Sequence, residues 1–497
     1  MVAVAEFRRR QEELGQFLTP PRIADFMASL FGRLPPNVRL LDAGAGAGAL
    51  TEAFVLRACS GQDGVKAIDA TLYEIDSAIQ AKLSRTMERC QTMCSRGGIK
   101  FSFAIHASDF IEEASTLLAQ ELFHRRVAVF DAAIVNPPYR KINAQSRERS
   151  FLRRAGIETT NLYTGFISLI HRLLAPGGEL VAITPRSFCN GTYFRGFRED
   201  LLNHLEIHRL HIFDSRSAAF ARDNVLQENV VFHAVKGRRQ PPKVTISASS
   251  GTGSGDMLEA RTCFGEIVHA KDPEIFIHIP SAATHTQSKE VMDGLDASLA
   301  SLKISVSTGA VVDFRLKTFL RQDSQEGTVP LIYPCHFNGG LVHWPKAGSR
   351  KPNAILDNDE TRSWLAPSGL YLLTKRFTSK EERRRLVACL FDPAVVRSKR
   401  VGFENHLNYF HSNGGGLDRD LAFGLFAFLN STVVDQYFRR FSGHTQVNAT
   451  DLRNLAYPDR STLEAIGRRI ENPNLSQEEI DALVEKYISC PQTSRSA

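Results

Sequence analysis

The chain has 497 residues, of which 43% are apolar and 23% charged, and it carries a formal net charge of +7 at pH 7. This length predicts two or three domains, and the ordinary composition, without an apolar run of about 18 residues or a signal peptide, excludes a disordered chain and a membrane span. Eight scattered cysteines without paired spacing favour reduced thiols in the cytoplasm over a disulfide framework or a zinc site, and the basic excess suits a polyanionic partner.

The first pattern with helical spacing follows Thr19-Pro20-Pro21. Thr19 is suited to cap a helix that starts with proline, and apolar residues then repeat at helical spacing up to Leu30. Taken alone, this pattern indicates only a capped amphipathic helix.

A short strand over 38–42 leads into a glycine-rich turn, Ala43-Gly44-Ala45-Gly46-Ala47-Gly48, and a helix from about Thr51. Strand, glycine turn and helix are typical of the first unit of a doubly wound nucleotide-binding sheet. The G-x-G-x-G spacing differs from the dinucleotide pattern, and Asp42 ends the strand before the glycines. Both features favour S-adenosylmethionine, because a ligand without pyrophosphate needs glycine for close backbone approach and not for a phosphate cradle.

Acidic residues follow the next two predicted strands, 67–72 and 101–105. A carboxylate at Glu74 can accept hydrogen bonds from two ribose hydroxyls, or it can cap the helix predicted for 77–94. Asp109 could accept from an adenine amino group while Phe110 packs on the ring. Alternatively, these two residues cap and staple the helix that follows.

The fourth predicted strand, 127–135, ends abruptly in Asn136-Pro137-Pro138-Tyr139. Proline removes a backbone donor and fixes φ, so this turn is stiff. Asn136 and Tyr139 are therefore held at the carboxyl edge of the sheet, where open α/β folds place their chemistry. Taken alone, the motif is equally well a strand-ending turn with a stacked tyrosine.

The rest of the first domain continues the alternation. Residues 140–160 are basic and without clear periodicity, which is typical of a mobile loop and also suits a nearby DNA backbone. A helix over 161–174, a strand over 179–184, and a closing antiparallel pair at 210–213 and 230–235 are predicted next. We expect no carboxylate or cysteine to accompany His204, His208 and His211, so we interpret them as surface or helix-end residues and predict no metal site.

The clearest shift in composition lies at 236–242 and 249–256, where glycine, proline and serine gather. It predicts a first domain over 1–240, a second over 257–460 in which the β/α rhythm is lost, and a helical tail over 461–497. The second domain has a basic segment at 375–400, and an amphipathic helix is predicted for 421–438. Basic residues interleaved with aromatics and amides favour contacts with bases and phosphates, although a charge run is more often a solvated face.

The order of these motifs resembles that of the N6-adenine-specific DNA methyltransferases of bacterial restriction–modification systems, in the Taq-type group whose catalytic domain comes first. The resemblance covers 1–240, and over 257–460 it rests on the looser matches at 424–431 and 442–448. It implies an α/β fold: a Rossmann-like S-adenosylmethionine-dependent methyltransferase domain with a mixed seven-stranded sheet, followed by an α+β target-recognition domain.

The resemblance also implies a role for each motif. The residues expected to bind the methionine end, the ribose and the adenine of S-adenosylmethionine are, in chain order, Thr19, Asp42, Ala43, Gly44, Gly46, Glu74, Asp109 and Phe110. The residues expected to act on the target base are Asn136, Pro137, Pro138, Tyr139 and Phe220. Among these, Asn136 and the Pro137 carbonyl accept from the amino group, and Tyr139 stacks on the flipped base. Phe220 is the second stacking aromatic, with Phe213 as the other option.

This assignment is chemically reasonable, because an exocyclic amino nitrogen is a poor nucleophile while its lone pair is delocalised into the ring. Two acceptors aimed at its hydrogens localise that lone pair, so most of the barrier lowering comes from positioning and electrostatics. The amino group is unreachable in a stacked duplex, so the base must be flipped out.

The implied partners are double-stranded DNA with a specific recognition sequence and a cognate restriction endonuclease acting separately on the same site. Three alternatives use the same motif: a cytosine-N4 methyltransferase, a protein-glutamine methyltransferase, and a decayed DNA-specificity subunit. The basic C-terminal domain argues against the glutamine enzymes, and the intact acids together with Asn136 argue against decay.

Overall fold

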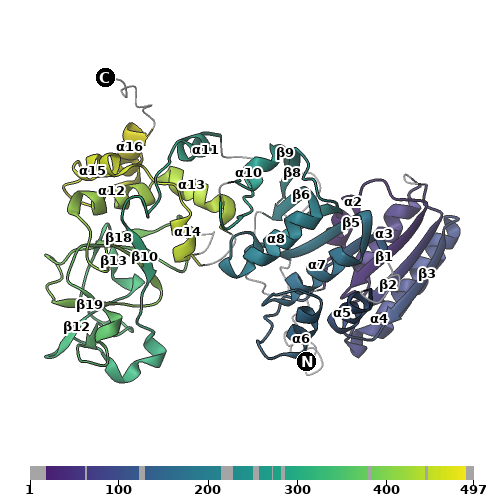
Figure 1. Ribbon diagram of the computed structural model, residues 1–497, viewed down its shortest axis with the longest axis horizontal. Helices are drawn as coiled ribbons and strands as arrows, with labels where there is room; N and C mark the ends of the chain where they lie inside the picture. Colours follow the sequence, from purple (N-terminus) through teal and green to yellow (C-terminus); the bar gives the residue numbers. More distant parts are fainter. Residues whose placement is uncertain are drawn as a thin grey trace. The chain divides into compact units, whose positions relative to one another are not determined.

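The computed structural model describes residues 18–61, 64–121, 129–213, 228–249, 257–270, 272–280, 286–378, 382–442 and 446–488. The chain divides into two compact units, Met1–Ala282 and Ala283–Ala497. In Figure 1 the first is coloured purple to teal and the second green to yellow. No helix among the described residues has the length and apolarity needed to cross a membrane.

The first unit is built on a nine-stranded sheet with the order β3-β2-β1-β4-β5-β7-β6-β8-β9. β1 to β5 pair in parallel, and β7 lies antiparallel between β5 and β6. The strands are β1 (Asn37–Ala43), β2 (Ala67–Tyr73), β3 (Lys100–His106), β4 (Phe130–Val135), β5 (Leu174–Pro185), β6 (Leu205–Phe213), β7 (Asn229–Lys236), β8 (Lys243–Ser249) and β9 (Leu258–Cys263).

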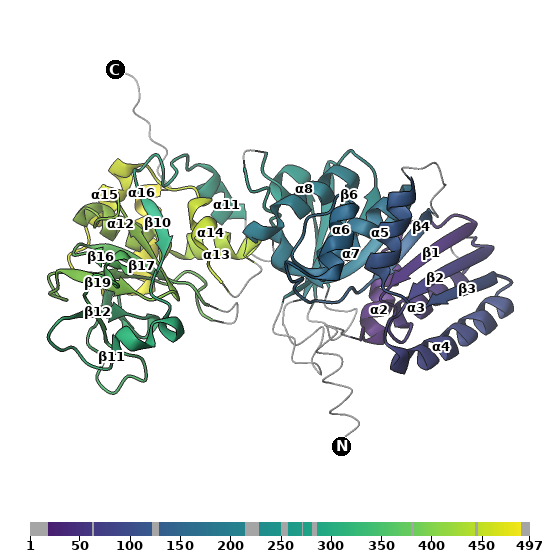
Figure 2. The same ribbon diagram turned by 60° about the horizontal axis from the view of Figure 1, so that its bottom comes forward.

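Helices cover both faces of this sheet (Figure 2). One core cluster joins one face of β4 and β5 to α5 and α7, and a second joins the opposite face to α2, α3 and α4. The helices are α2 (Pro21–Ser29), α3 (Ala49–Cys59), α4 (Ser77–Arg96), α5 (Phe110–Glu121), α6 (Arg147–Arg154), α7 (Leu162–Leu173), α8 (Arg195–His204) and α10 (Phe264–Ile267). The predicted doubly wound α/β domain is confirmed.

Two details of the prediction are wrong. The sheet has nine strands and not seven, and the first unit continues to Ala282 and not to residue 240. The glycine- and proline-rich stretch after β7 is a tight connection: the Gln240 side chain accepts from Ile207 N at 3.0 Å and donates to Leu205 O at 2.7 Å. It delivers β8 to a parallel pairing with β6, and β9 completes the edge.

The second unit is α+β, as predicted. It contains a six-stranded sheet, β10-β20-β17-β18-β14-β13, and a five-stranded sheet, β11-β15-β12-β19-β16. The strands are β10 (Ser305–Thr308), β11 (Leu320–Arg321), β12 (Thr328–Ile332), β13 (Phe337–Asn338), β14 (Leu341–Val342), β15 (Ala354–Leu356), β16 (Leu365–Pro367), β17 (Tyr371–Lys375), β18 (Ala388–Phe391), β19 (Arg400–Phe403) and β20 (Leu407–His411). The helices are α11 (Thr286–Asp293), α12 (Arg419–Leu429), α13 (Thr432–Phe441), α14 (Ala449–Arg453), α15 (Arg460–Gly467) and α16 (Gln477–Ile488).

The predicted single helix over 421–438 is two helices, because the chain breaks at Ser431, whose hydroxyl caps α13 by accepting from Val434 N. The C-terminal helices are not a separate tail. A Cβ on Gly424 of α12 would lie 1.9 Å from Leu463 O of α15, and one on Gly467 would lie 1.8 Å from Asp420 O. The backbones of α12 and α15 therefore touch, and α15 belongs to the core of this unit.

Several arginines of the basic segment 375–400 serve the fold. Arg385 is 1% exposed and donates to Thr378 O and to Ser442 Oγ. Arg384 donates to the Gln477 side chain, and Arg400 pairs with Asp357 at 3.1 Å. The charge density of the sequence therefore overstates the cationic surface that this segment offers to DNA.

Candidate cofactor and substrate site

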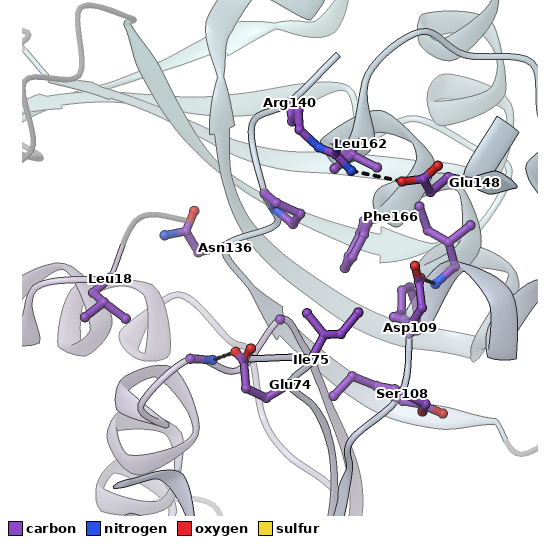
Figure 3. Close-up of a pocket in the computed structure, with 16 residues that line it drawn as sticks. Leu18, Glu74, Ile75, Ser108, Asp109, Asn136, Arg140, Glu148, Leu162 and Phe166 are labelled. Atoms are coloured by element: carbon purple, nitrogen blue, oxygen red, sulfur yellow. Dashed lines mark hydrogen bonds and ion pairs between the residues drawn. The ribbon is translucent and has the colours of Figure 1, made fainter. Parts of the chain in front are cut away.

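A cavity opens at the carboxyl edge of the parallel strands, where the predicted motifs converge (Figure 3). Its lining includes residues that follow four consecutive strands of the sheet, among them Gly44, Glu74, Asp109 and Asn136. The parallel pairing of β3, β2, β1 and β4 brings these strand ends to one edge. The sequence prediction that they form one site is consistent with this geometry.

The glycine-rich turn between β1 and α3 forms one wall. Gly44 has φ +83° and Gly46 has φ +54°, a region that favours glycine. The N–H groups of Gly44 and Ala45 donate to Tyr73 O at 3.0 and 2.9 Å, which fixes the turn on β2. A Cβ on Gly46 would lie 3.2 Å from Leu18 Cδ2. Side chains here would narrow the cavity that the turn lines.

Glu74 lies directly beyond β2 and is 2% exposed. Its Oε2 accepts from Gly46 N at 2.8 Å, and its Oε1 accepts from Asp76 N at 2.7 Å. The carboxylate thus ties the glycine turn to the end of β2 and lines the cavity. Each carboxylate oxygen has capacity for a second hydrogen bond, so a vicinal diol can still be accepted.

Asp109 caps α5, since its Oδ1 accepts from Ile111 N at 2.8 Å and from Glu112 N at 3.4 Å. Burial raises its pKa, against the effect of these two donors. Phe110 is buried, with its ring centroid 5.1 Å from Tyr73 and 5.0 Å from Phe166. The predicted capping role and the predicted position beside a ring-binding pocket are therefore compatible.

Asp42 is buried behind the glycine turn and does not line the cavity. Its Oδ2 accepts from Thr51 Oγ1 at 2.7 Å, which ties β1 to α3. Its Oδ1 is buried without a partner in the described part of the chain. Burial raises the pKa of this carboxyl from 3.8 to about 7, opposed by the Thr51 hydrogen bond.

The raised pKa of Asp42 predicts a pH-dependent stability. Between pH 4 and 7 the Asp42 carboxyl keeps a proton in the folded protein that it has lost in the unfolded chain, so the contribution of this group to the free energy of unfolding falls as pH rises, by about 1.4 kcal/mol per pH unit. We expect Asp42→Asn, which cannot ionise, to gain relative to wild type over this interval. Urea unfolding of both proteins from pH 4 to 8 measures the difference, and a constant difference would contradict the assignment.

The Asn136 amide is oriented by the segment that precedes α2. Its Nδ2 donates to Thr19 Oγ1 at 3.0 Å, and Asn136 and Pro138 line the cavity while Thr19 does not. Tyr139 packs on the α7 side of the sheet, where its hydroxyl donates to Ile183 O at 3.2 Å and its ring lies 6.2 Å from Tyr163. Burial raises its pKa far above the ordinary value, so the hydroxyl stays protonated.

Not every predicted residue reaches the cavity. Ala43, Pro137 and Tyr139 do not line it, and Phe220 lies outside the described residues. Phe213, the other option, is 8% exposed in the core, with its ring 4.9 Å from that of His211. His211 itself is 1% exposed between Ser247 and Ser249 of β8, which corrects its interpretation as a surface residue.

The basic stretch 140–160 is largely ordered around α6 by ion pairs. Arg140 pairs with Glu148 at 2.9 Å on the cavity wall, Arg147 pairs with Glu112 at 2.8 Å, and Arg153 pairs with Glu158 at 3.0 Å. The sequence prediction of an irregular mobile loop is wrong here. The arginines are spaced to meet acids five to nine residues away or on α5.

One cluster has the composition of a metal site. His171, Asp200 and His204 bring their ligand atoms within 4.8 Å of one another between α7 and α8. The Arg172 guanidinium donates to both Asp200 oxygens, at 2.9 and 3.0 Å. That guanidinium already supplies the cation, so we interpret the cluster as a structural ion pair.

Sequence reasoning missed several cavity residues. Ile75 is 52% exposed between Glu74 and Asp76, an apolar side chain left in solvent at a strand end. Its position between two acids at a strand end was the signal in the sequence that could have placed it in the cavity. Phe166 and Leu162 line the cavity from α7, although helical spacing marked them only as inward-facing.

The lining suits S-adenosylmethionine. A buried carboxylate stands beside a glycine turn that leaves room for backbone approach, and a second carboxylate stands beside aromatic and aliphatic side chains. Carboxylates accept from hydroxyl and amino groups, and the apolar walls suit a purine. Donors and acceptors thus match a nucleoside, as the sequence predicted.

Comparisons with known proteins agree with this geometry. Residues 69–220 match the family described as Eco57I restriction-modification methylase. The chain is 42% identical over 481 residues to the type II methyltransferase M.PstI of Providencia stuartii, covering 96% of this chain and 93% of the relative. It is 46% identical over 485 residues to M.BsuBI of Bacillus subtilis, covering 97% and 95%. The fold is similar to that in a DrdV–DNA complex, with a TM-score of 0.50 and 12% identity over 92% of this chain and 57% of the other.

Proposed function

Since the chain belongs to the type II DNA methyltransferases of restriction–modification systems, which use S-adenosylmethionine, we propose that it methylates the N6 amino group of one adenine within a specific double-stranded DNA sequence. We also propose that a cognate restriction endonuclease acts on the same sequence without a stable complex. The enzyme works in the cytoplasm, where its DNA substrate lies.

The observation that carries the proposal is the orientation of Asn136 at the cavity wall. Its Nδ2 is used by Thr19, so its Oδ1 is the atom presented for accepting. A rigid acceptor at a strand end, followed by the two prolines, suits an incoming amino group. With the Pro137 carbonyl as a second acceptor, both hydrogens of that group are held.

Each residue of the site then has its own role in this proposal. Glu74 accepts the ribose hydroxyls, and Asp109 accepts from the cofactor's adenine amino group, with Ile75, Phe110 and Phe166 beside the ring. When bound, S-adenosylmethionine supplies an electrophilic methyl on sulfur. Asn136 and Pro137 polarise the target amino group and localise its lone pair for attack. Tyr139 stacks on the flipped base, and its protonated hydroxyl holds the ring by donating to Ile183 O.

We assign target recognition to the second unit, Ala283–Ala497. Adenine is favoured over cytosine by the Asn at the first motif position, following the resemblance. A glutamine amide presents a similar nitrogen, but an enzyme for it would have no use for a unit of this size.

Sequencing of DNA from cells that express the chain tests the proposal, with modified bases identified as N6-methyladenine or N4-methylcytosine. We expect N6-methyladenine at one sequence motif, and a strongly reduced fraction of modified sites in cells that express the Asn136→Ala variant. N4-methylcytosine would replace the proposed base, and unmodified DNA would favour a protein substrate or a decayed subunit.

A further inference from the structure

Asn229, the first residue of β7, lies at the carboxyl edge of the parallel strands, where the cavity opens. Asn229 is 5% exposed, and neither its Oδ1 nor its Nδ2 has a hydrogen-bond partner within the described chain. A buried amide without partners destabilises a fold, because it loses hydrogen bonds to water and gains none. A ligand bound at this edge would supply the missing hydrogen-bond partner.

The backbone around Asn229 is held firmly. Asn229 is in register with Pro185 at the end of β5, and Arg186 N donates to Glu228 O at 2.7 Å just beyond. The Arg186 and Glu228 side chains form a buried ion pair at 3.0 Å. The amide is therefore presented from a rigid strand end and not from a loop.

Asn229 lies on the same face of the sheet as Asn136. Side chains alternate along a strand, so Asn229 shares the face of Val231, which belongs to the core cluster that contains Ile134 and α2. Asn136 follows β4 on that face, since its amide donates to Thr19 immediately before α2. Both amides therefore stand on the α2 side of the carboxyl edge.

The spacing between the two amides suits a single base. Val135 of β4 pairs with Ala182 of β5, which places Asn136 level with Ile183, two residues before Pro185. β5 alone separates β4 from β7. Strand spacing and rise then put the two backbones roughly 10 Å apart across the sheet and roughly 7 Å along it. At this separation the two side chains can reach opposite edges of one planar ring.

We propose that Asn229 reads the target base, with its Nδ2 donating to the ring nitrogen beside the amino group, N1 or N7 of the flipped adenine. The inference rests on the proposed function. Asn136 and Pro137 offer only acceptors, which hold an amino group whatever carries it. If Asn229 donates a hydrogen bond, the substrate must also carry an acceptor next to its amino group, as adenine does. An Asn amide is a common hydrogen-bond partner of adenine.

Duplexes carrying the sequence that the wild-type enzyme methylates test this, with the target adenine intact or replaced by 1-deazaadenine or 7-deazaadenine. Asn229→Leu is expected to lower kcat/KM on the intact duplex about 10- to 100-fold. On one deaza duplex the wild type is expected to lose a similar factor, and the variant nothing further, because the same hydrogen bond is already gone. S-adenosylmethionine affinity stays unchanged, and the midpoint of thermal unfolding holds or rises, because leucine has nearly the same shape without an unpaired amide.

Ser115→Ala is the matched control. Ser115 Oγ on α5 is also buried without a partner in the described chain. Its removal is expected to leave kcat/KM unchanged. Wild-type rates for Asn229→Leu and Asn229→Ala would overturn the inference, as would loss of cofactor binding in both, or deaza effects that multiply with the substitution. A product other than N6-methyladenine would instead refute the proposed function. In that case the ratio of kcat/KM between wild type and Asn229→Leu on the intact duplex would still show whether Asn229 contacts the target base.

Discussion

Replacement of Asn136 by alanine is expected to slow methyl transfer by two to three orders of magnitude, about 10²- to 10³-fold, while the protein still folds and binds its cofactor and DNA. The amide oxygen is one of two acceptors proposed to localise the lone pair of the target nitrogen, and this role exists only as the reaction proceeds. Removal of one such preorganised group costs about 10²- to 10³-fold in kcat. Transfer of a labelled methyl group to DNA measures the rate.

The control for this variant is Asn143→Ala, the same change at an exposed position seven residues later. It is expected to retain wild-type turnover. Calorimetry with S-adenosylmethionine and a DNA-binding titration complete the comparison. If Asn136→Ala loses both binding activities together, the residue holds the edge of the sheet and does not act on the substrate.

The second large effect is expected for Glu74→Ala, as a loss of S-adenosylmethionine affinity. The variant removes the proposed acceptor for two ribose hydroxyls and frees the Gly46 and Asp76 N–H groups that the carboxylate now fixes. Hydrogen bonds to a charged group contribute about 1.5–3 kcal/mol each, so the loss of two is expected to raise Kd about 10²- to 10⁴-fold. Calorimetric titration of the full chain measures this Kd.

Glu88→Ala provides the comparison, because Glu88 is an exposed carboxylate on α4. Its Kd is expected to match that of wild type. An unchanged Kd for Glu74→Ala would remove this residue from the cofactor site. Thermal unfolding without cofactor shows whether a raised Kd of Glu74→Ala comes instead from a general loss of the folded unit.

The predicted site rests on local signals, which is why much of it could be obtained from sequence. A strand that ends in an acid, in glycines or in Asn-Pro-Pro-Tyr marks its own carboxyl end, and parallel pairing brings those ends together. Glu74, Asp109 and Asn136 all line one cavity for this reason. Asp42 looked equivalent, but its side chain turns inward to Thr51.

Features that depend on distant pairing were not predictable. β8 follows a stretch rich in glycine and proline, and only its pairing with β6 shows that the sheet continues. The burial of His211 depends on the same strand. Likewise, Gly424 and Gly467 lie about 40 residues apart, and nothing local indicates that their helices touch. Nothing local indicates that the Asn229 side chain, just before the predicted strand 230–235, is buried.

The internally paired arginines have a consequence for how binding responds to ionic strength. DNA affinity falls with added salt in proportion to the number of phosphates that protein cations neutralise, because each such contact releases condensed counterions. Arg140, Arg147 and Arg400 already have carboxylate partners. Each contributes little to that release, so the salt sensitivity of DNA binding will be smaller than the basic residue count of the sequence implies.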